Sequence, residues 1–189
     1  AATGRADDLL TATLLIAALE WRGFLAGMPL GAKWLNAFFS GVTPRTAGFN
    51  SIDYADAHPI TLMVTDIYMF IGGGSAGTAG GIKVTTAIVL LAAMAAEFRG
   101  RDDTTVGHRT VPKTVVRQAM TVAAAGVVSV TGGVVALRLF DPQFTADQVS
   151  FEVMSAFATT GLSTGITAGL STPSQLVLCL LMYAGRIGP

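Results

Sequence analysis

The sequence predicts an all-α integral membrane protein with repeated units of helix, short helix and helix, and three observations support this fold class. Of the 189 residues, 51% are hydrophobic and 13% are charged, whereas soluble domains carry about 25% charged residues. Segment 118–137 contains no charged residue, and as a helix it is long enough to cross a hydrocarbon core of about 30 Å. The string Thr-Ala-Gly-Phe-Asn at 46–50 returns as Thr-Thr-Gly-Leu-Ser at 159–163. Each copy stands between apolar segments, which indicates repeated units.

The first apolar run covers residues 9–19 and continues past Glu20, Trp21 and Arg22 to Ala26. It predicts a membrane span whose far end carries an aromatic ring and an ion pair at the interface. Segment 33–40 is too short to cross, so a short helix is expected there. It leads into residues 46–50, which we call the first string; residues 159–163 are the second string.

The next stretch has two apolar runs, 59–71 and 82–98, separated by glycine and other small residues at 72–81. Residues 50–59 contain no Lys or Arg, whereas 99–117 contains five basic residues. Because an excess of Lys and Arg marks the cytoplasmic side, we expect one crossing by a helix that is broken at 72–81. Backbone that is not helical at this depth must be buried by protein or line a water-filled cavity. Segment 72–81 is therefore expected to face a permeation path.

The second half follows the same plan. It predicts a span that ends at Phe140, a short helix at about 148–157, the second string, and a last apolar run after Pro173. No Lys or Arg lies between Asp141 and Ser174, so both strings are expected on one, acidic side of the membrane. The acids there would raise the local cation concentration at the mouth, although short loops can also be acidic without such a role; they are Asp53, Asp56, Asp141, Asp147 and Glu152.

The two strings have the composition of an ion filter. A dehydrated cation needs a cage of oxygen atoms, and a glycine within a Thr-x-Gly run allows successive backbone carbonyls to line one narrow axis. His58 and His108 are expected on opposite sides of the membrane, so no transition-metal site is predicted. The single cysteine, Cys179, forms no internal disulfide. The candidate ion-binding residues are Thr46, Ala47, Gly48, Phe49, Asn50, Thr159, Thr160, Gly161, Leu162 and Ser163.

Four motifs along nearly the whole chain resemble the TrkH/KtrB family of potassium-uptake subunits. They are SGVTPRTAGFNSID at 40–53, FIGGGSAGTAGGIKVTT at 70–86, FEVMSAFATTGLSTGI at 151–166 and LLMYAGRIGP at 180–189. The resemblance implies four helix, pore-helix, helix (M1-P-M2) units around a potassium-channel-like pore. Residues 1–98 would form the third unit, 99–117 a cytoplasmic basic linker, and 118–189 the fourth unit, truncated in its last helix.

The resemblance makes the two strings two of four filter strands whose carbonyls coordinate the ion. Gly48 and Gly161 would be the selectivity glycines, and because relatives with serine at such a position tend to favour Na⁺, glycine favours K⁺. The transported ion is then K⁺, with Na⁺ as the alternative, and no covalently bound cofactor is expected. Two of the four filters lie outside this chain, so selectivity does not follow from these two alone.

The resemblance also implies a gate beneath the filter. The glycine segment would be a mobile intramembrane loop, although it has Ala76-Gly77-Thr78 where the family usually has Pro-Gly-Ser. Arg186 would face the pore as an electrostatic barrier, at an insertion cost of about 2.5–3.5 kcal/mol at mid-membrane. Alternatively, the glycines only permit tight helix packing and Arg186 reaches the cytosolic interface. The gating residues are Gly72, Gly73, Gly74, Ser75, Ala76, Gly77, Thr78, Ala79, Gly80, Gly81 and Arg186.

The expected setting is the bacterial inner membrane, where the chain would be a multi-pass protein in contact with lipid. The resemblance implies a homodimer that contains the first and second repeats of the same chain and rests on a cytosolic nucleotide-binding ring. Segment 99–117 would dock to the ring or to lipid headgroups, and no nucleic acid is expected. Channel-like and ion-coupled transport both stay open.

Two other functions compete with transport. Residues 72–77 match the G-x-G-x-x-G pattern of a dinucleotide-binding enzyme, but the alternating strand and helix pattern of that fold does not follow. The other is a membrane scaffold that conducts no ions.

Overall fold

The structure of the protein is a computed structural model that describes residues 2–21, 23–45, 47–72, 84–100, 105–106 and 109–187. Its helices are α1 (Ala2–Glu20), α2 (Leu30–Val42), α3 (Pro59–Ile71), α4 (Val84–Phe98), α5 (Lys113–Phe140), α6 (Ala146–Phe157) and α7 (Thr172–Ile187). Two 3₁₀ turns, η1 (Tyr54–Asp56) and η2 (Thr167–Gly169), precede α3 and α7. The described chain is thus helical, as the sequence predicts, apart from one small hairpin.

The hairpin is the one departure from an all-α fold. Strands β1 (Thr105–Val106) and β2 (Arg109–Thr110) pair antiparallel, with Thr105 opposite Thr110. The hairpin lies within the basic segment 99–117, and α5 begins before that segment ends.

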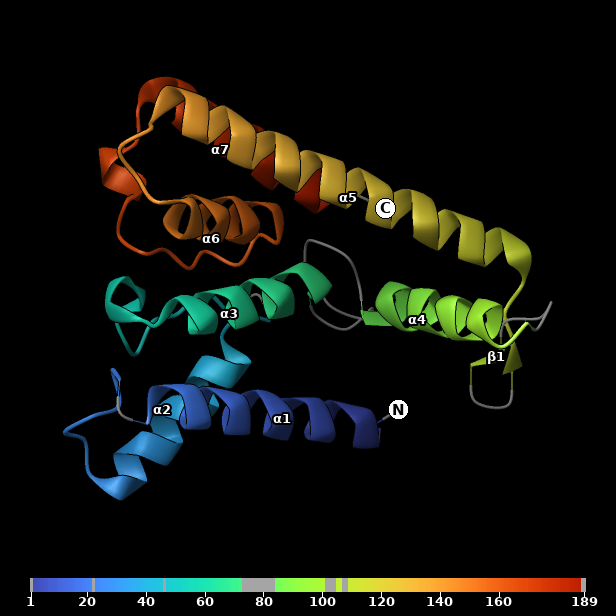
Figure 1. The fold of residues 1–189 in the computed structure, drawn as a ribbon, viewed down its shortest axis with the longest axis horizontal. Helices are drawn as coiled ribbons and strands as arrows, with labels where there is room; N and C mark the ends of the chain where they lie inside the picture. The colour runs from blue at the N-terminus through green and yellow to red at the C-terminus, as the bar shows by residue number, and fades with distance from the viewer. Residues whose placement is uncertain are drawn as a thin grey trace.

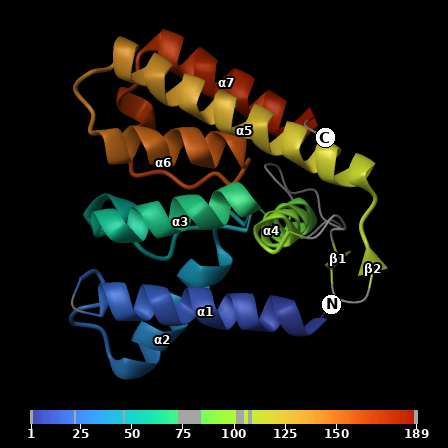
Figure 2. The same ribbon diagram turned by 45° about the vertical axis from the view of Figure 1, so that its right-hand side comes forward.

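The helices form layers. Figure 1 shows α5 and α7 side by side, α6 against both of them, α3 next to α6, and α1 with α2 on the other side of α3. The turned view in Figure 2 shows α4 beyond the end of α3, where it packs against the hairpin and α5. Helices α3 and α6, which are far apart in the sequence, are therefore direct neighbours.

One helix of the described ranges, α5, is both long and apolar enough to cross a membrane. It contains the predicted segment 118–137 and extends it at both ends. Several large apolar side chains on α5 are exposed, among them Val128 and Leu139, as expected for a surface that faces lipid. Three shorter apolar helices, Leu9–Glu20, Pro59–Ile71 and Val84–Phe98, fall below that length.

The first predicted span needs a correction at its far end. Helix α1 ends at Glu20 rather than continuing to Ala26. The Glu20 carboxylate is fully buried and accepts hydrogen bonds from the backbone N–H of Phe24 (3.2 Å) and of His58 (2.9 Å). Glu20 therefore accepts hydrogen bonds from backbone donors in the interior, where a charge requires such partners. It does not form the exposed interfacial ion pair that the sequence predicts.

Besides a small cluster of Ala17, Leu25 and Ala37 that joins α1 to α2, two apolar clusters hold the layers together. Leu137 of α5, Val153 of α6 and Leu181 of α7 belong to one of them. The second joins the two halves of the chain, because it unites Tyr54 and Met69 with Phe151 and other residues of the second half. The second cluster contains Leu162, so it reaches the second string.

The two halves follow the same order of elements. Helices α1, α2 and α3 with η1 are matched by α5, α6 and α7 with η2. Turn η1 begins as many residues after Gly48 as η2 begins after Gly161, and α3 and α7 also begin at matching distances from these glycines. The two strings therefore occupy equivalent places in the two halves.

Candidate functional site

The two strings meet in space. Each follows directly after a short helix, α2 or α6. A Cβ atom built on Gly48 would overlap the backbone carbonyl oxygen of Thr160, and one built on Gly161 would lie 4.0 Å from the Gly48 Cα. The closest approach is thus between the glycine of one string and the backbone of the other. Thr46 of the first string lies outside the described residues.

Backbone conformation gives a second reason for glycine at both positions. Gly48 has φ +71° and Gly161 has φ +92°, values that side chains other than glycine rarely adopt. Thr159, with φ +53°, is the one residue other than glycine that has a positive φ in the described chain. Both strings thus leave their helices through a left-handed turn.

Each string is held by a hydroxyl residue at the end of its short helix. Thr43 Oγ1 donates to the Phe49 carbonyl oxygen at 2.7 Å, and the Ala47 N–H donates to the Thr43 carbonyl at 3.2 Å. In the second half, Ser155 Oγ accepts from the Gly161 N–H at 3.2 Å. The Ser155 carbonyl accepts from the Thr160 N–H at 2.9 Å. Sequence reasoning did not select Thr43 and Ser155; a hydroxyl residue just before each string is the signal that indicates them.

Glu152 of α6 holds the segment that follows the second string. Its Oε1 accepts hydrogen bonds from Ser163 Oγ and from the Thr164 N–H, the latter at 3.1 Å. Its Oε2 accepts from Thr167 Oγ1 at 2.9 Å. The Glu152 side chain is 5% exposed. It is therefore an internal group and not part of an acidic mouth, which corrects one expectation from the sequence.

Asp141 corrects the same expectation. It is 4% exposed, and its Oδ2 accepts from the Ser171 N–H (3.0 Å) and Ser171 Oγ (2.8 Å) just before α7. Hydrogen bonds from Ser174 and then from Ser171 lower the pKa of the Asp141 carboxyl to about 2. Of the remaining acids in that set, Asp53 and Asp147 are exposed, and the Asp56 side chain lies outside the description.

Glu20 and Asp141 have equivalent structural roles in the two halves. Each lies at the end of the first helix of its half, and each accepts from backbone and hydroxyl donors at the start of the last helix. For Glu20 the donors are the His58 N–H and Thr61 Oγ1 at the start of α3. A negative group at a helix N-terminus satisfies free N–H groups and complements the helix dipole. The two carboxylates thus fix α3 and α7 against α1 and α5.

Two hydroxyls beside the second string have no hydrogen-bond partner within the described part of the chain. They are Thr160 Oγ1 and Thr164 Oγ1, on side chains that are 5% and 3% exposed. Buried hydroxyls normally find a partner. These two oxygens are therefore exceptions to that rule among the described residues.

The predicted gate is described only at its edges. Gly72 is the C-cap of α3, with φ +62°, and residues 73–81 lie outside the described residues. Arg186 is exposed in the last turn of α7. The residue before it, Gly185, packs so closely on α6 that a Cβ there would overlap the Phe157 carbonyl oxygen. Arg186 therefore follows directly after the point where α7 touches the end of α6.

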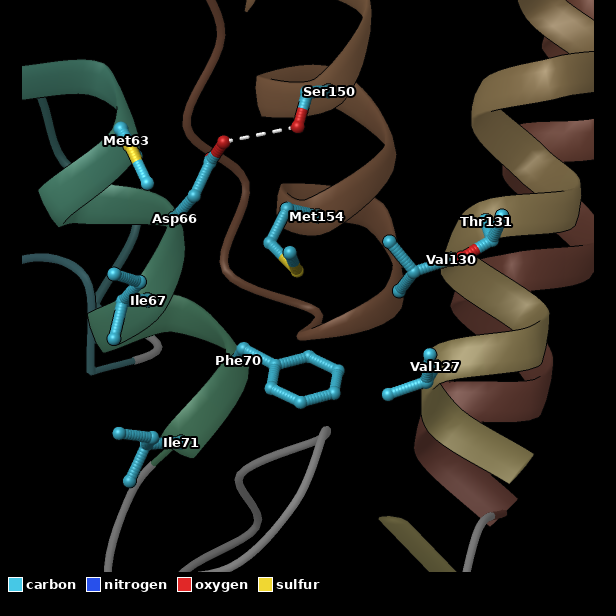
Figure 3. A pocket seen from close by; sticks show the side chains of 10 residues that line it. All are labelled: Met63, Asp66, Ile67, Phe70, Ile71, Val127, Val130, Thr131, Ser150 and Met154. Carbon is cyan, nitrogen blue, oxygen red and sulfur yellow. Dashed lines mark hydrogen bonds between the residues drawn. The ribbon is translucent and has the colours of Figure 1, made fainter. Parts of the chain in front are cut away.

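An acidic side chain that sequence reasoning missed lines a cavity of about 440 Å³ between α3, α5 and α6. Figure 3 shows Asp66 pointing toward Ser150 among mostly apolar side chains. Asp66 Oδ2 accepts from Ser150 Oγ at 3.1 Å, whereas the buried Oδ1 has no partner among the described residues. A single acid in an apolar run is the signal that would have found it.

Comparison with known families and proteins gives consistent matches. The family model described as "TrkH: Cation transport protein" matches residues 9–189. The Ktr system potassium uptake protein B of Bacillus subtilis is 38% identical over 96% of this chain and 43% of that protein. The protein of the same name from Vibrio alginolyticus is 36% identical over 96% of this chain and 40% of its own length. The potassium/sodium uptake protein NtpJ of Enterococcus hirae is 40% identical over 81% of this chain and 35% of that protein.

A solved structure agrees at the level of the fold. The crystal structure of the potassium transporter TrkH from Vibrio parahaemolyticus superposes with a TM-score of 0.79, at 21% identity, over 96% of this chain and 40% of that chain. The chain thus spans less than half the length of the relatives that it matches.

Proposed function

Because this chain belongs to the TrkH family of cation transport proteins, we propose that it forms two of four filter strands in a transmembrane pathway for K⁺ uptake. The family consists of transporters and not of enzymes, so the dinucleotide-binding alternative at residues 72–77 is set aside. In this proposal α1, α2 and α3 form one helix, pore-helix, helix unit, and α5, α6 and α7 form the next.

The observation that carries the proposal is the contact between the two strings. Gly48 and Gly161 lie together at the ends of α2 and α6, where the negative end of each helix dipole favours a cation. Backbone carbonyls of neighbouring strands are the ligands that replace the hydration shell of K⁺ in selective filters. The hydroxyl oxygens of Thr160, in the second string, and of Thr164, just after it, have no partner among the described residues, and we propose them as additional oxygen ligands.

The choice of K⁺ as the main ion is supported by two findings. Both strings carry glycine at the central position, and the names of the relatives specify potassium uptake or potassium/sodium uptake. Na⁺ is the alternative ion, since the other two filter strands belong to the part of the protein outside this chain.

The proposed gate combines segment 72–81 with Arg186. Gly185 contacts the end of α6 at the Phe157 carbonyl, and this contact supports a position of Arg186 near the second string. A fixed positive charge there opposes the passage of cations, and movement of the glycine segment would release the barrier. The proposed partners are a second copy of the protein, membrane lipid and a cytosolic nucleotide-binding ring; names such as "Ktr system" indicate a system of several components.

The test uses the full-length protein in proteoliposomes, with K⁺ and Na⁺ fluxes measured separately. Gly161→Ser should lower the preference for K⁺ over Na⁺, whereas Arg186→Ala should raise the flux of K⁺ without changing that preference. Gly132→Ala serves as the control because a Cβ at Gly132 meets open space. An unchanged preference in Gly161→Ser would show that the second string is not a filter, and absence of flux in the wild type would favour the scaffold.

A further inference from the structure

We propose that Glu152 is a positioning residue that sets ion selectivity by holding the second string in place, an inference that rests on the proposed filter. In this proposal Glu152 does not coordinate the ion. It acts through the segment 163–167, which begins at the last residue of the string and ends in turn η2.

The carboxylate uses both of its oxygens on this one segment. Ser163 Oγ and the Thr164 N–H share Oε1, and Thr167 Oγ1 donates to Oε2. Ser163 Oγ also lies 2.8 Å from Thr167 Oγ1 and accepts from the Gly165 N–H at 2.8 Å. Hydrogen bonds to an ionised acceptor are about twice as strong as neutral ones. Since Ser163 and Thr167 each donate their single hydroxyl hydrogen to Glu152, the carboxylate ties the outer end of the second string to the pore helix α6.

The support of the Glu152 side chain itself is rigid. Its neighbours Phe151 and Val153 on α6 are fully buried. Helix α6 begins with a capping box, in which Thr145 and Gln148 exchange hydrogen bonds. A side chain on a packed, capped helix keeps its position better than one on a loop. The network thus transmits the position of α6 to the string.

Among the described residues, no carboxylate holds the first string in this way. Phe39 stands as many residues before Gly48 as Glu152 stands before Gly161, and its apolar side chain is 37% exposed. The first string is held instead by the Thr43 hydroxyl on the Phe49 carbonyl. Loss of Glu152 would therefore loosen the second string alone and make the cage uneven.

Selectivity is the property that such loosening should change. A filter discriminates between K⁺ and Na⁺ through the arrangement and number of its carbonyl dipoles, so a strand free to move admits Na⁺ more readily. Flux can continue because the ligands themselves stay in the chain. A residue with a purely structural role would lower the amount of folded protein and leave the ratio of the two fluxes unchanged.

The experiment measures the ratio of K⁺ to Na⁺ flux through the full-length protein in proteoliposomes, together with its melting temperature. We expect Glu152→Ala to lower this ratio about tenfold, the effect of losing a charged hydrogen-bond acceptor. Glu152→Gln should retain most of the flux ratio. Its amide oxygen can take the place of Oε1 and accept from Ser163 and Thr164, and its amide N–H can donate to the Thr167 hydroxyl. Glu97→Ala and Glu97→Gln are the matched controls, since Glu97 is exposed on α4.

If Glu152→Ala does not fold, Thr167→Val tests the positioning role of Glu152, because it removes a single donor to Glu152 Oε2. It should lower the flux ratio by a smaller factor at an unchanged melting temperature. A wild-type ratio in Thr167→Val and in any folded Glu152→Ala would overturn the role of Glu152. If Gly161→Ser lowers the ratio in the same experiment, the filter stands and only the positioning inference fails; if it does not, the proposed function itself fails.

Discussion

At the scale of single residues, the protein depends on glycines at close backbone contacts and on buried carboxylates that accept several hydrogen bonds. Gly48 and Gly161 combine positive φ with a close approach of backbone to backbone. Glu20, Asp141 and Glu152 are buried acids, and each is engaged by backbone and hydroxyl donors. These three carboxylates therefore hold the polypeptide around the two strings in place.

Gly48→Ala tests the closest contact between the strings. The new Cβ would overlap the Thr160 carbonyl, and a left-handed backbone costs a residue with a side chain about 1–2 kcal/mol. We expect K⁺ uptake by the full-length protein to fall on the order of tenfold or more, because the two strands must separate. Gly132→Ala is the control, and uptake at wild-type level in Gly48→Ala would contradict the contact.

At the scale of elements, the two halves have the same order of helices but different side chains at equivalent positions. A carboxylate at the end of the first helix accepts hydrogen bonds from donors at the start of the last helix in both halves, but it is Glu20 in one and Asp141 in the other. Short helices α2 and α6 both end at a string, and only α6 carries a carboxylate that reaches beyond it. The shared features define the unit, and the differences make the two strands unequal.

The Asp141 cap predicts a dependence of stability on pH. Its pKa of about 2 in the folded protein lies below its ordinary value, so its stabilising contribution is complete above that ordinary value and is lost as the pH falls toward 2. Asp141→Asn should melt at a lower temperature than the wild type at pH 6. The difference should shrink as the pH falls from about 4 toward 2. A difference that stays constant over this range would contradict the cap; Glu97→Gln is the control for removal of an exposed carboxylate.

The contact between α7 and α6 predicts unequal costs for two similar substitutions. Gly185→Ala would bring a Cβ into the Phe157 backbone carbonyl, whereas a Cβ in Gly133→Ala meets only side chains, Leu181 at 2.6 Å and Val153 at 3.0 Å. Backbone cannot yield as a side chain can, and overpacking typically costs about 1–3 kcal/mol. Thermal denaturation in detergent should therefore show a larger loss for Gly185→Ala. Equal losses would mean that α7 is free to move away from α6.

At the scale of the whole molecule, the chain corresponds to less than half the length of its relatives. It covers 40% to 43% of the two potassium uptake relatives that it matches along nearly its full length, and α5 is the one described helix that can span a membrane by itself. Many large apolar side chains are exposed, among them Leu91, Leu139 and Tyr183. Apolar surfaces of this kind are suited to contact with lipid or with other protein.

The exposed acids predict an electrostatic effect at the mouth of the proposed pore. Asp53 and Asp147 remain exposed, so the double variant Asp53→Asn, Asp147→Asn should raise the apparent KM for K⁺ by about two- to threefold at low ionic strength. The maximal rate should stay unchanged. The effect should vanish in high concentrations of an impermeant salt, because salt screens exposed charges. A change in KM that persists in high salt would point to structural damage; Asn at position 53 can still accept from the Ala55 N–H, as Asp53 does.

Much of the fold could be predicted because its signals are local. Apolar runs at 59–71 and 118–137, the short helix near 148–157 and the glycines of the strings all follow from neighbouring residues. The end of α1 could not be predicted, because Glu20 is removed from the interface by donors at His58 and Thr61, which lie far along the chain. The roles of Asp141 and Glu152 were misjudged for the same reason, since an acid in a loop has the same local pattern whether it is exposed or buried.

The sequence by itself determined a helical membrane protein, the positions of its two Thr-x-Gly strings and its kinship with cation transporters, because hydropathy and motif are properties of short segments. Tertiary structure alone decided that Gly48 meets Thr160, that α3 packs on α6, and that three acids hold backbone and hydroxyl groups. These facts depend on contacts between residues that are distant in the chain. Such contacts arise when helices pack and buried charges find donors, and no local pattern encodes them.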